Sequence, residues 1–218
     1  MIILGHRANT PRWIRRFLAE GADGVEMDVY CRGGELYASH LSLVGRARLL
    51  RERIASLLTG LHLLGPYRAR NLLALVPQGS PVMLDLKSRV SEECLAELSV
   101  LGESYKVYVS IRDYDLAPRL AEKGLSVLLS MDHRPLGVLD ELRAASAAGV
   151  SINKRYLDED LARLLRGHGY IVAAWTINTA EEAIKVSSMG ADIIVTDYPG
   201  IARRALRSRA STPKEGEW

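Results

Sequence analysis

Short apolar runs alternate with segments of helical period along nearly the whole chain. The apolar runs are rich in Val and Ile, and several are apolar without interruption, as strands buried on both faces of a parallel sheet are. The sequence predicts strands over residues 2–4, 24–30, 81–87, 106–111, 125–131, 150–153, 171–177 and 192–196, each with a helical segment after it. Thr10 is placed to cap the first helix, and Pro11 to occupy its first position.

One region departs from this alternation. Gly33 and Gly34 predict a turn into a short return strand over residues 35–39. Residues 43–76 are rich in Leu and Arg and helical in period, so we expect a small helical insertion after the second strand. We expect Ser91 to cap the helix that follows the third strand, and the tail over residues 208–218 to be frayed.

The order of these elements predicts the fold class. Counting the hairpin with its strand, the pattern contains about eight β-α units. That number in a chain of 218 residues favours a closed (β/α)8 TIM barrel of the α/β class over an open doubly wound sheet. Since we find no internal repeat, linker or low-complexity tract, we expect residues 1–218 to form a single domain.

Composition narrows the class of protein. The chain is 48% hydrophobic and 25% charged, which is typical of a soluble globular protein. The net charge of +3 is small and does not argue for a nucleic-acid partner. Basic residues gather in residues 46–53 and 203–209, where solvated helix faces are favoured over a site for a polyanion.

The two cysteines and the apolar runs bear on the compartment. Cys31 and Cys94 are far apart and form no C-x-x-C motif, which argues against a disulfide scaffold or a zinc–thiolate site and indicates a reducing cytoplasm. We expect no signal peptide, and no apolar run approaches the ~18 residues of a membrane span. The expectation is a cytoplasmic protein without stable membrane insertion, for which a homo-oligomer is left open.

Two carboxylates in one strand are the first sign of chemistry. Glu26 and Asp28 are two residues apart, so both project from the same face of the strand. Burying two like charges together is costly unless a cation neutralises them. Oxygen ligands suit Mg²⁺ or Ca²⁺ better than zinc.

Other polar residues follow the ends of the predicted strands, where the active site of such a barrel lies. In chain order these residues are His6, Arg7, Glu26, Asp28, His40, Asp85, Lys87, Arg112, Asp132, His133, Asn153, Lys154, Trp175, Asn178 and Asp197. If the fold prediction is right, carboxylates and imidazoles converge on one mouth, where histidines not needed by a metal can act as acid and base near neutral pH.

Plainer explanations exist for individual residues. Asp85 and Lys87 could form a simple ion pair, and His6 could be a hydrogen-bonded core histidine. Glu26 and Asp28 could pair with Arg7 and Lys87 in a structural network. The placement of all these residues at the ends of the first three strands favours a site, whereas His62 and His168 fall in the insertion and in a surface turn and are expected to be ordinary.

Several motifs, taken together, resemble the glycerophosphodiester phosphodiesterases. They are, in order, Gly-His-Arg-Ala-Asn-Thr-Pro from Gly5, Gly-Ala-Asp-Gly-Val-Glu-Met-Asp-Val from Gly21, Ala-Ser-His ending at His40, Leu-Asp-Leu-Lys ending at Lys87, Ala-Trp-Thr-Ile-Asn ending at Asn178, and Gly-Ala-Asp-Ile-Ile-Val-Thr-Asp-Tyr-Pro-Gly ending at Gly200. The similarity runs from His6 to about Pro199.

The resemblance implies a TIM barrel with an insertion and a role for each motif. Two catalytic histidines of the family correspond to His6 and His40, and its three metal-binding carboxylates to Glu26, Asp28 and Asp85. Arg7 and Lys87 match positions around the phosphate, and Trp175 matches an aromatic residue that borders the pocket. The chain departs from the family pattern at Ala8, at Leu41 and at Asp85, which is one methylene shorter than the usual Glu.

The function that the resemblance implies is metal-dependent hydrolysis of a glycerophosphodiester to sn-glycerol 3-phosphate and an alcohol, with one divalent cation, Mg²⁺ or Ca²⁺. Which histidine is the base and which the acid is not assigned by the sequence. One alternative is phosphodiester cleavage of lysophospholipids or other lipid headgroups, with an apolar lip over residues 57–64. Another is a non-catalytic barrel that binds phosphorylated ligands.

Overall fold

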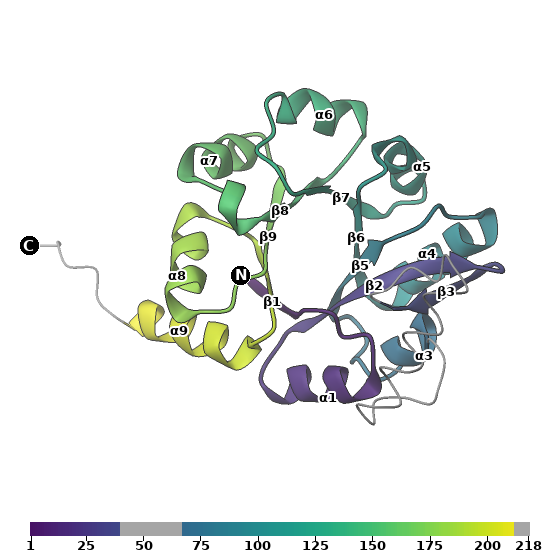
Figure 1. Ribbon diagram of the computed structural model, residues 1–218, viewed down its shortest axis with the longest axis horizontal. Coiled ribbons are helices and arrows are strands. Elements are labelled where there is room, and N and C mark those ends of the chain that lie inside the picture. Colours follow the sequence, from purple (N-terminus) through teal and green to yellow (C-terminus); the bar gives the residue numbers. More distant parts are fainter. Residues whose placement is uncertain (40–66, 212–218) are drawn as a thin grey trace, which may run out of the picture.

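The computed structural model describes residues 1–39 and 67–211 and contains a closed barrel of parallel strands (Figure 1). The ten strands of its sheet lie in the order β1-β10-β9-β8-β7-β6-β5-β2-β3-β4, and an additional pairing of β1 with β2 closes the ring. Strand β3 pairs antiparallel with β2, and β4 pairs antiparallel with β3, so eight parallel strands remain in the ring itself. The predicted (β/α)8 TIM barrel is confirmed.

The strand bounds agree with the sequence prediction to within two residues at most ends. The ring strands are β1 (Ile2–Gly5), β2 (Gly24–Arg32), β5 (Pro81–Leu86), β6 (Lys106–Ile111), β7 (Ser126–Met131), β8 (Gly149–Asn153), β9 (Ile171–Trp175) and β10 (Ile193–Thr196). They are almost wholly buried, which is why their sequences are apolar on both faces.

Helices surround the ring of strands (Figure 1). They are α1 (Pro11–Ala19), α3 (Ala69–Leu73), α4 (Glu92–Ser104), α5 (Ala117–Glu122), α6 (Val138–Ala144), α7 (Glu159–Gly167), α8 (Ala180–Met189) and α9 (Pro199–Ser211), with short 3-10 turns η1 (Tyr114–Leu116) and η2 (Lys154–Tyr156). Helix α1 begins as predicted, because Thr10 Oγ1 accepts a hydrogen bond from the Trp13 amide and Pro11 takes the first position. Ser91 caps α4 through the Cys94 amide.

The core has two parts, one on each side of the barrel wall. The larger part lies between the helices and the outer face of the strands. The smaller part fills the barrel itself with side chains from alternate strand positions: Leu4, Met83, Tyr108, Leu128, Ala173, Ile193 and Val195. This apolar plug lies below the polar residues at the strand ends and closes the bottom of the site.

The hairpin after β2 is confirmed, but the insertion that follows is not wholly helical. Strand β3 (Glu35–Ala38) pairs antiparallel with β2, as the Gly33-Gly34 turn predicted. Within the segment 43–76 the prediction of helix is wrong at β4 (Tyr67–Arg68), which extends the sheet beside β3, and right at α3. A helical period cannot reveal a short strand whose pairing partner lies thirty residues away in sequence. Residues 40–66 of the predicted insertion lie outside the described residues.

The expectation of two separate thiols is wrong. Cys31, at the end of β2, and Cys94, in the first turn of α4, form a disulfide, with their Cα atoms 6.0 Å apart. They are 63 residues apart in sequence, but α4 packs beside the hairpin, so the fold brings them together. The inference of a reducing cytoplasm therefore loses the observation on which it rested.

The C-terminal helix is longer than predicted. The tail was predicted to fray from Ser208, yet α9 continues through Ser211, so the helical structure extends further than expected; residues 212–218 lie outside the described residues. Among the described helices, none combines the length and the apolar character needed to cross a membrane.

Candidate active site

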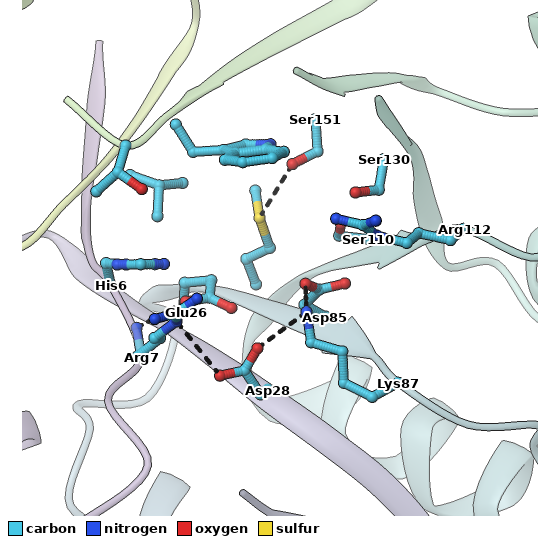
Figure 2. Close-up of a pocket in the computed structure, with 14 residues that line it drawn as sticks. His6, Arg7, Glu26, Asp28, Asp85, Lys87, Ser110, Arg112, Ser130 and Ser151 are labelled. Atoms are coloured by element: carbon cyan, nitrogen blue, oxygen red, sulfur yellow. Dashed lines mark hydrogen bonds and ion pairs between the residues drawn. The ribbon is translucent and has the colours of Figure 1, made fainter. Parts of the chain in front are cut away.

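Strand register brings the three predicted carboxylates together. Asp28 of β2 lies directly beside Asp85 of β5, and Glu26 precedes Asp28 by two residues on the same face. One carboxylate oxygen from each of the three lies within 4.8 Å of the others. All three line a pocket at the carboxyl ends of the strands (Figure 2).

Burial makes this cluster electrostatically unfavourable without a cation. The pKa of Glu26 is raised well above its ordinary value by burial, and the neighbouring charges of Asp28 and Asp85 add to the effect. Burial also raises the pKa of Asp85, although Lys87 opposes the shift. Burial is therefore the main reason why full ionisation of the cluster is costly, and Lys87 offsets only part of that cost.

The donor set fits a hard divalent cation. Asp85 Oδ1 is buried and, among the described residues, has no hydrogen-bond partner, which is costly for a carboxylate oxygen unless something else binds it. The three ligands offer only oxygen atoms, the preference of Mg²⁺ and Ca²⁺. These observations fit a bound divalent cation and do not discriminate between the two metals.

The remaining bonds of the acidic cluster hold it in place. Glu26 Oε2 accepts a hydrogen bond from the Arg7 amide at 2.7 Å, where Arg7 adopts a positive φ of 53°. Asp28 is 2% exposed and is held by Asn9, whose Nδ2 donates to Asp28 Oδ2 at 3.0 Å and whose Oδ1 accepts from the Asp28 amide at 3.1 Å. The β1–α1 loop thus fixes both carboxylates of β2.

Two cations flank the cluster. Lys87 Nζ is 3.0 Å from Asp28 Oδ1 and also forms an ion pair with Asp85. Burial lowers the pKa of Lys87, but Asp85 and Asp28 outweigh burial, so its pKa is raised and the ammonium stays charged. Arg7 is half exposed, with Nε 3.9 Å from Asp28 Oδ2. The structural network that the sequence left open is therefore present, and it surrounds the pocket.

His6 is held by a carboxylate from the neighbouring strand. His6 and Asp197 follow β1 and β10 respectively, which pair in parallel, and His6 Nδ1 lies 2.8 Å from Asp197 Oδ1. The His6 hydrogen bond lowers the pKa of Asp197, opposed by burial and aided by Asn178. Because an ionised carboxylate only accepts hydrogen bonds, Nδ1 of His6 is the donor, which leaves Nε2 free to act.

Asn178 completes this arrangement. Its Nδ2 donates to Asp197 Oδ2 at 2.7 Å, and its Oδ1 accepts from the Asp197 amide at 3.0 Å. Both carboxylate oxygens of Asp197 are thus engaged, one by the histidine and one by the amide. The histidine ring is oriented by a side chain that is itself oriented.

The opposite wall of the pocket carries hydroxyl groups and a guanidinium and no carboxylate among its described lining residues. Ser110 of β6, Ser130 of β7 and Ser151 of β8 line it together with Arg112 and Trp175. Figure 2 shows these serines across the pocket from His6 and Glu26. The pocket encloses about 520 Å³ of space, part of it open to solvent.

Other strand-end residues are engaged elsewhere. Lys154 Nζ pairs with Glu182 at 2.5 Å, and Asn153 Nδ2 donates to Asp132 Oδ1 at 2.8 Å. His133 is exposed and does not line the pocket. His168 lies at the C-terminus of α7 as expected, with Nδ1 2.9 Å from the Leu164 carbonyl oxygen. His40 and His62 lie outside the described residues.

No protein-family model and no curated protein sequence matches the chain. Solved structures do match. A phosphodiesterase from Oleispira antarctica, solved in complex with the product sn-glycerol-3-phosphate, is 19% identical with a TM-score of 0.78, over 95% of this chain and 97% of that one. The glycerophosphodiester phosphodiesterase of Thermotoga maritima is 20% identical with a TM-score of 0.71, over 94% and 97% of the two chains. The chain shares their fold.

A third solved structure is similar over nearly its full length. A glycerophosphodiester phosphodiesterase from Parabacteroides distasonis is 17% identical, with a TM-score of 0.67 over 96% of this chain and 98% of that one. In all three comparisons nearly the full length of each chain is covered. The overall fold is therefore shared with these structures, although the sequences are at most 20% identical.

Sequence reasoning noted Asn178 and Asp197 at strand ends but assigned them no role, and it did not single out Asn9. The signal for Asp197 was its position one residue after a strand that neighbours β1 in any closed barrel. The signal for Asn9 was its place three residues after His6 in a loop that must pass over β2. The Asp197 contact depends on ring closure, which joins the first strand to the last, whereas the Asn9 contact depends on the pairing of β1 with β2.

Proposed function

We propose that this protein hydrolyses glycerophosphodiesters to sn-glycerol 3-phosphate and an alcohol. The observation that carries the proposal is a buried cluster of three carboxylates beside a carboxylate-held histidine in one pocket. The resemblance of the motifs and the similarity to solved glycerophosphodiester phosphodiesterases support it. The enzyme would be a phosphoric diester hydrolase.

Glu26, Asp28 and Asp85 would hold one divalent cation, Mg²⁺ or Ca²⁺. When bound, such an ion supplies Lewis-acid polarisation of a phosphoryl oxygen and a template for the substrate. The like charges of the three carboxylates and the orphaned Asp85 Oδ1 support this assignment.

Lys87 and Arg7 would bind the phosphate. Lys87 is fixed by two carboxylates, so its ammonium points along the pocket wall and loses little freedom when an anion arrives. Arg7 is half exposed and can turn its guanidinium toward the phosphoryl oxygens. Both charges would offset the negative charge that develops during phosphoryl transfer. Trp175 would border the pocket beside the substrate.

His6 and His40 would form the acid–base pair. His6 exchanges its proton through Nε2, because Nδ1 donates to Asp197. Asp197 stabilises the imidazolium that forms when His6 takes up a proton, as the buried aspartate does in serine protease triads. The partner role falls to His40, which follows β3 in the chain and lies outside the described residues. The nucleophile would be the glycerol hydroxyl of the substrate itself. As its oxygen bonds to phosphorus and its proton passes to one histidine, the bond from phosphorus to the alcohol oxygen breaks and the alcohol leaves with a proton from the other histidine. Water then opens the cyclic phosphate that has formed.

The test is a coupled assay for glycerol 3-phosphate over a panel of water-soluble and acylated diesters, with and without Mg²⁺ or Ca²⁺ after treatment with a chelator. We expect release from the water-soluble diesters, silencing by the chelator and recovery with one of the two ions.

His6→Ala and His40→Ala should each abolish turnover while the thermal unfolding temperature stays close to that of the wild type. Phosphate-ligand binding without any release would favour the non-catalytic barrel instead.

The lysophospholipid alternative rests on residues 57–64, which lie outside the described residues. The acylated members of the panel test it directly. A rate on acylated diesters above the rate on water-soluble ones would make lipid headgroups the substrate class.

A further inference from the structure

Arg112 directly follows β6, and its exposed side chain lines the pocket. Strand β6 alternates so that Tyr108, Ser110 and Arg112 share one face, and Tyr108 belongs to the cluster that fills the barrel. The same face therefore carries Ser110 and Arg112 into the pocket, which both residues line. Figure 2 shows the Arg112 side chain entering from the side of Ser110 and Ser130, across from His6.

The charge of Arg112 is not consumed by a partner in the part of the chain that the structure describes. Lys87 is engaged by Asp28 and Asp85, and Arg7 approaches Asp28. Arg112, in contrast, makes no hydrogen bond or ion pair to any of residues 1–39 or 67–211. It is close enough to Asp85 to lower the pKa of that carboxyl, but not close enough to form an ion pair with it. This guanidinium is therefore available to bind an anion that enters the pocket.

The surroundings of Arg112 are hydroxyl groups rather than carboxylates. Ser110 and Ser130 are buried, line the pocket and donate no side-chain hydrogen bond to the described residues. Ser151 has only the weak contact of its Oγ with Met83 Sδ at 4.0 Å. At three barrel positions where an apolar side chain could have been buried, the chain thus has a serine. Hydroxyls beside a guanidinium are well suited to hydrogen-bond a carboxylate or a phosphate.

The pocket accordingly has two halves of opposite character. The β1, β2 and β5 side carries His6 and the acidic cluster, where the proposed function places the scissile phosphate. The β6, β7 and β8 side carries Arg112 and the serines. A diester bound at its phosphate has two ends, and the end that leaves as the alcohol would extend over the second half.

We infer that Arg112, with Ser110, Ser130 and Ser151, forms a subsite for a leaving alcohol that carries an anionic group. The inference rests on the proposed diester hydrolysis for the identity of the group it receives. It narrows the substrate class to glycerophosphodiesters whose alcohol bears a carboxylate or a further phosphate.

A matched pair of substrates tests this directly. Glycerophosphoserine and glycerophosphoethanolamine have the same phosphodiester and the same ammonium, and they differ by one carboxylate. The wild-type protein is expected to show a kcat/KM at least about tenfold higher for the serine diester, since a charge-assisted hydrogen bond to a guanidinium is worth that much or more. A second pair, glycerophosphoglycerol with and without a terminal phosphate monoester, distinguishes phosphate from carboxylate as the preferred anion.

Arg112→Gln should remove the preference within each pair, and Arg112→Lys should keep part of it. Arg155→Gln is the matched control, because Arg155 is exposed in η2, just after β8, and does not line the pocket. The substitution removes the same charge as Arg112→Gln. The control should keep the wild-type ratio. A preference that is absent in the wild type, or that Arg112→Gln leaves unchanged, would overturn the subsite.

Binding separates this inference from the proposed function. Calorimetric titration of the same pairs into the metal-loaded protein gives a ratio of dissociation constants whether or not the diesters are cleaved. Tighter binding of the anionic member by about tenfold, lost in Arg112→Gln, supports the subsite even if no diester is hydrolysed. Equal affinities, or no binding of either member, reject it even if hydrolysis is observed.

Discussion

A histidine with one ring nitrogen held by a carboxylate exchanges protons through the other. His6 is in this situation, because Asp197 accepts from Nδ1 and Asn178 engages the remaining oxygen of Asp197. Asp197→Asn would replace an acceptor with a group that can donate, and the imidazole would lose its preferred tautomer. We expect kcat for diester hydrolysis to fall by about 10²-fold or more with little change in KM.

The control for this variant is Asp115→Asn, an exposed aspartate of η1 outside the pocket. It should keep wild-type kcat. If Asp197→Asn also kept wild-type kcat, the orienting role of Asp197 would be wrong.

The lowered pKa of Asp197 also makes the stability of the folded protein depend on pH. Its folded-state pKa is depressed, chiefly by the His6 hydrogen bond, so the ionised form stabilises the folded protein above the unfolded pKa of ~3.9. That contribution is lost as the pH falls through the lower folded-state pKa. The side chain is 44% exposed, so solvent screening keeps the contribution small. The difference in unfolding temperature between wild type and Asp197→Asn should shrink as the pH falls below about pH 4.

In the metal-free protein, the acidic cluster changes stability with pH in the opposite direction to Asp197. Because burial and two neighbouring carboxylates raise the pKa of Glu26, its ionised form destabilises the fold, and stability falls as the pH rises through the folded-state pKa. Glu26→Gln should therefore unfold at a higher temperature than the wild type in chelator at neutral pH. Addition of Mg²⁺ or Ca²⁺ should stabilise the wild type and have a much smaller effect on the variant. A cation-induced shift of equal size in both proteins would place the cation elsewhere.

At the scale of elements, the close approach of β2 to its neighbour β5 sets the position of the acids. A Cβ on Gly24 would come within 1.7 Å of the Pro81 carbonyl oxygen, a backbone atom that cannot turn away. We expect Gly24→Ala to lower the free energy of unfolding by about 3 kcal/mol or more, at the upper end of overpacking costs.

Gly102 in α4 is the matched control, since a Cβ there meets only Leu125 Cδ2 at 3.7 Å. Gly102→Ala should be neutral or stabilise by up to about 1 kcal/mol, the helix preference of Ala over Gly. Urea titrations of the two variants measure both effects. Equal stability of the two variants would show that β2 and β5 can separate without cost.

The Cys31–Cys94 disulfide joins β2, which carries two of the acids, to α4. The described cysteines are both paired, so we expect no thiol to react in the denatured, unreduced protein, and two after reduction. The Cys31→Ser/Cys94→Ser double variant should lose about 2–4 kcal/mol of unfolding free energy. Full thiol reactivity before reduction would contradict the pairing.

Most elements were predictable from the sequence because their signals are local. Continuous apolar runs revealed the ring strands, and Thr10, Pro11 and Ser91 marked helix starts through bonds to residues only a turn away. Strand β4 and the disulfide were not predictable, because both depend on partners that the folded chain brings from a distance. Local patterns carry no information about which distant segment will be the neighbour.

At the scale of the whole molecule, barrel closure assembles the site. The fold prediction alone was enough to bring Glu26, Asp28 and Asp85 to one mouth, because carboxyl ends of parallel strands meet there. It was not enough to assign Asp197 to His6, since that pair depends on the seam where β1 meets β10. Nor did it distinguish Arg112 from Lys154, which is also a strand-end cation but is paired with Glu182.

In the proposed function, this barrel cleaves glycerophosphodiesters with a cation held by Glu26, Asp28 and Asp85 and with proton exchange at His6. The most direct measurement is the release of glycerol 3-phosphate from a water-soluble glycerophosphodiester by the wild type and by His6→Ala, each with chelator and with restored Mg²⁺ or Ca²⁺. We expect release only by the wild type and only with the cation restored. Release by His6→Ala at a rate close to the wild type, or undiminished release in chelator, would contradict it.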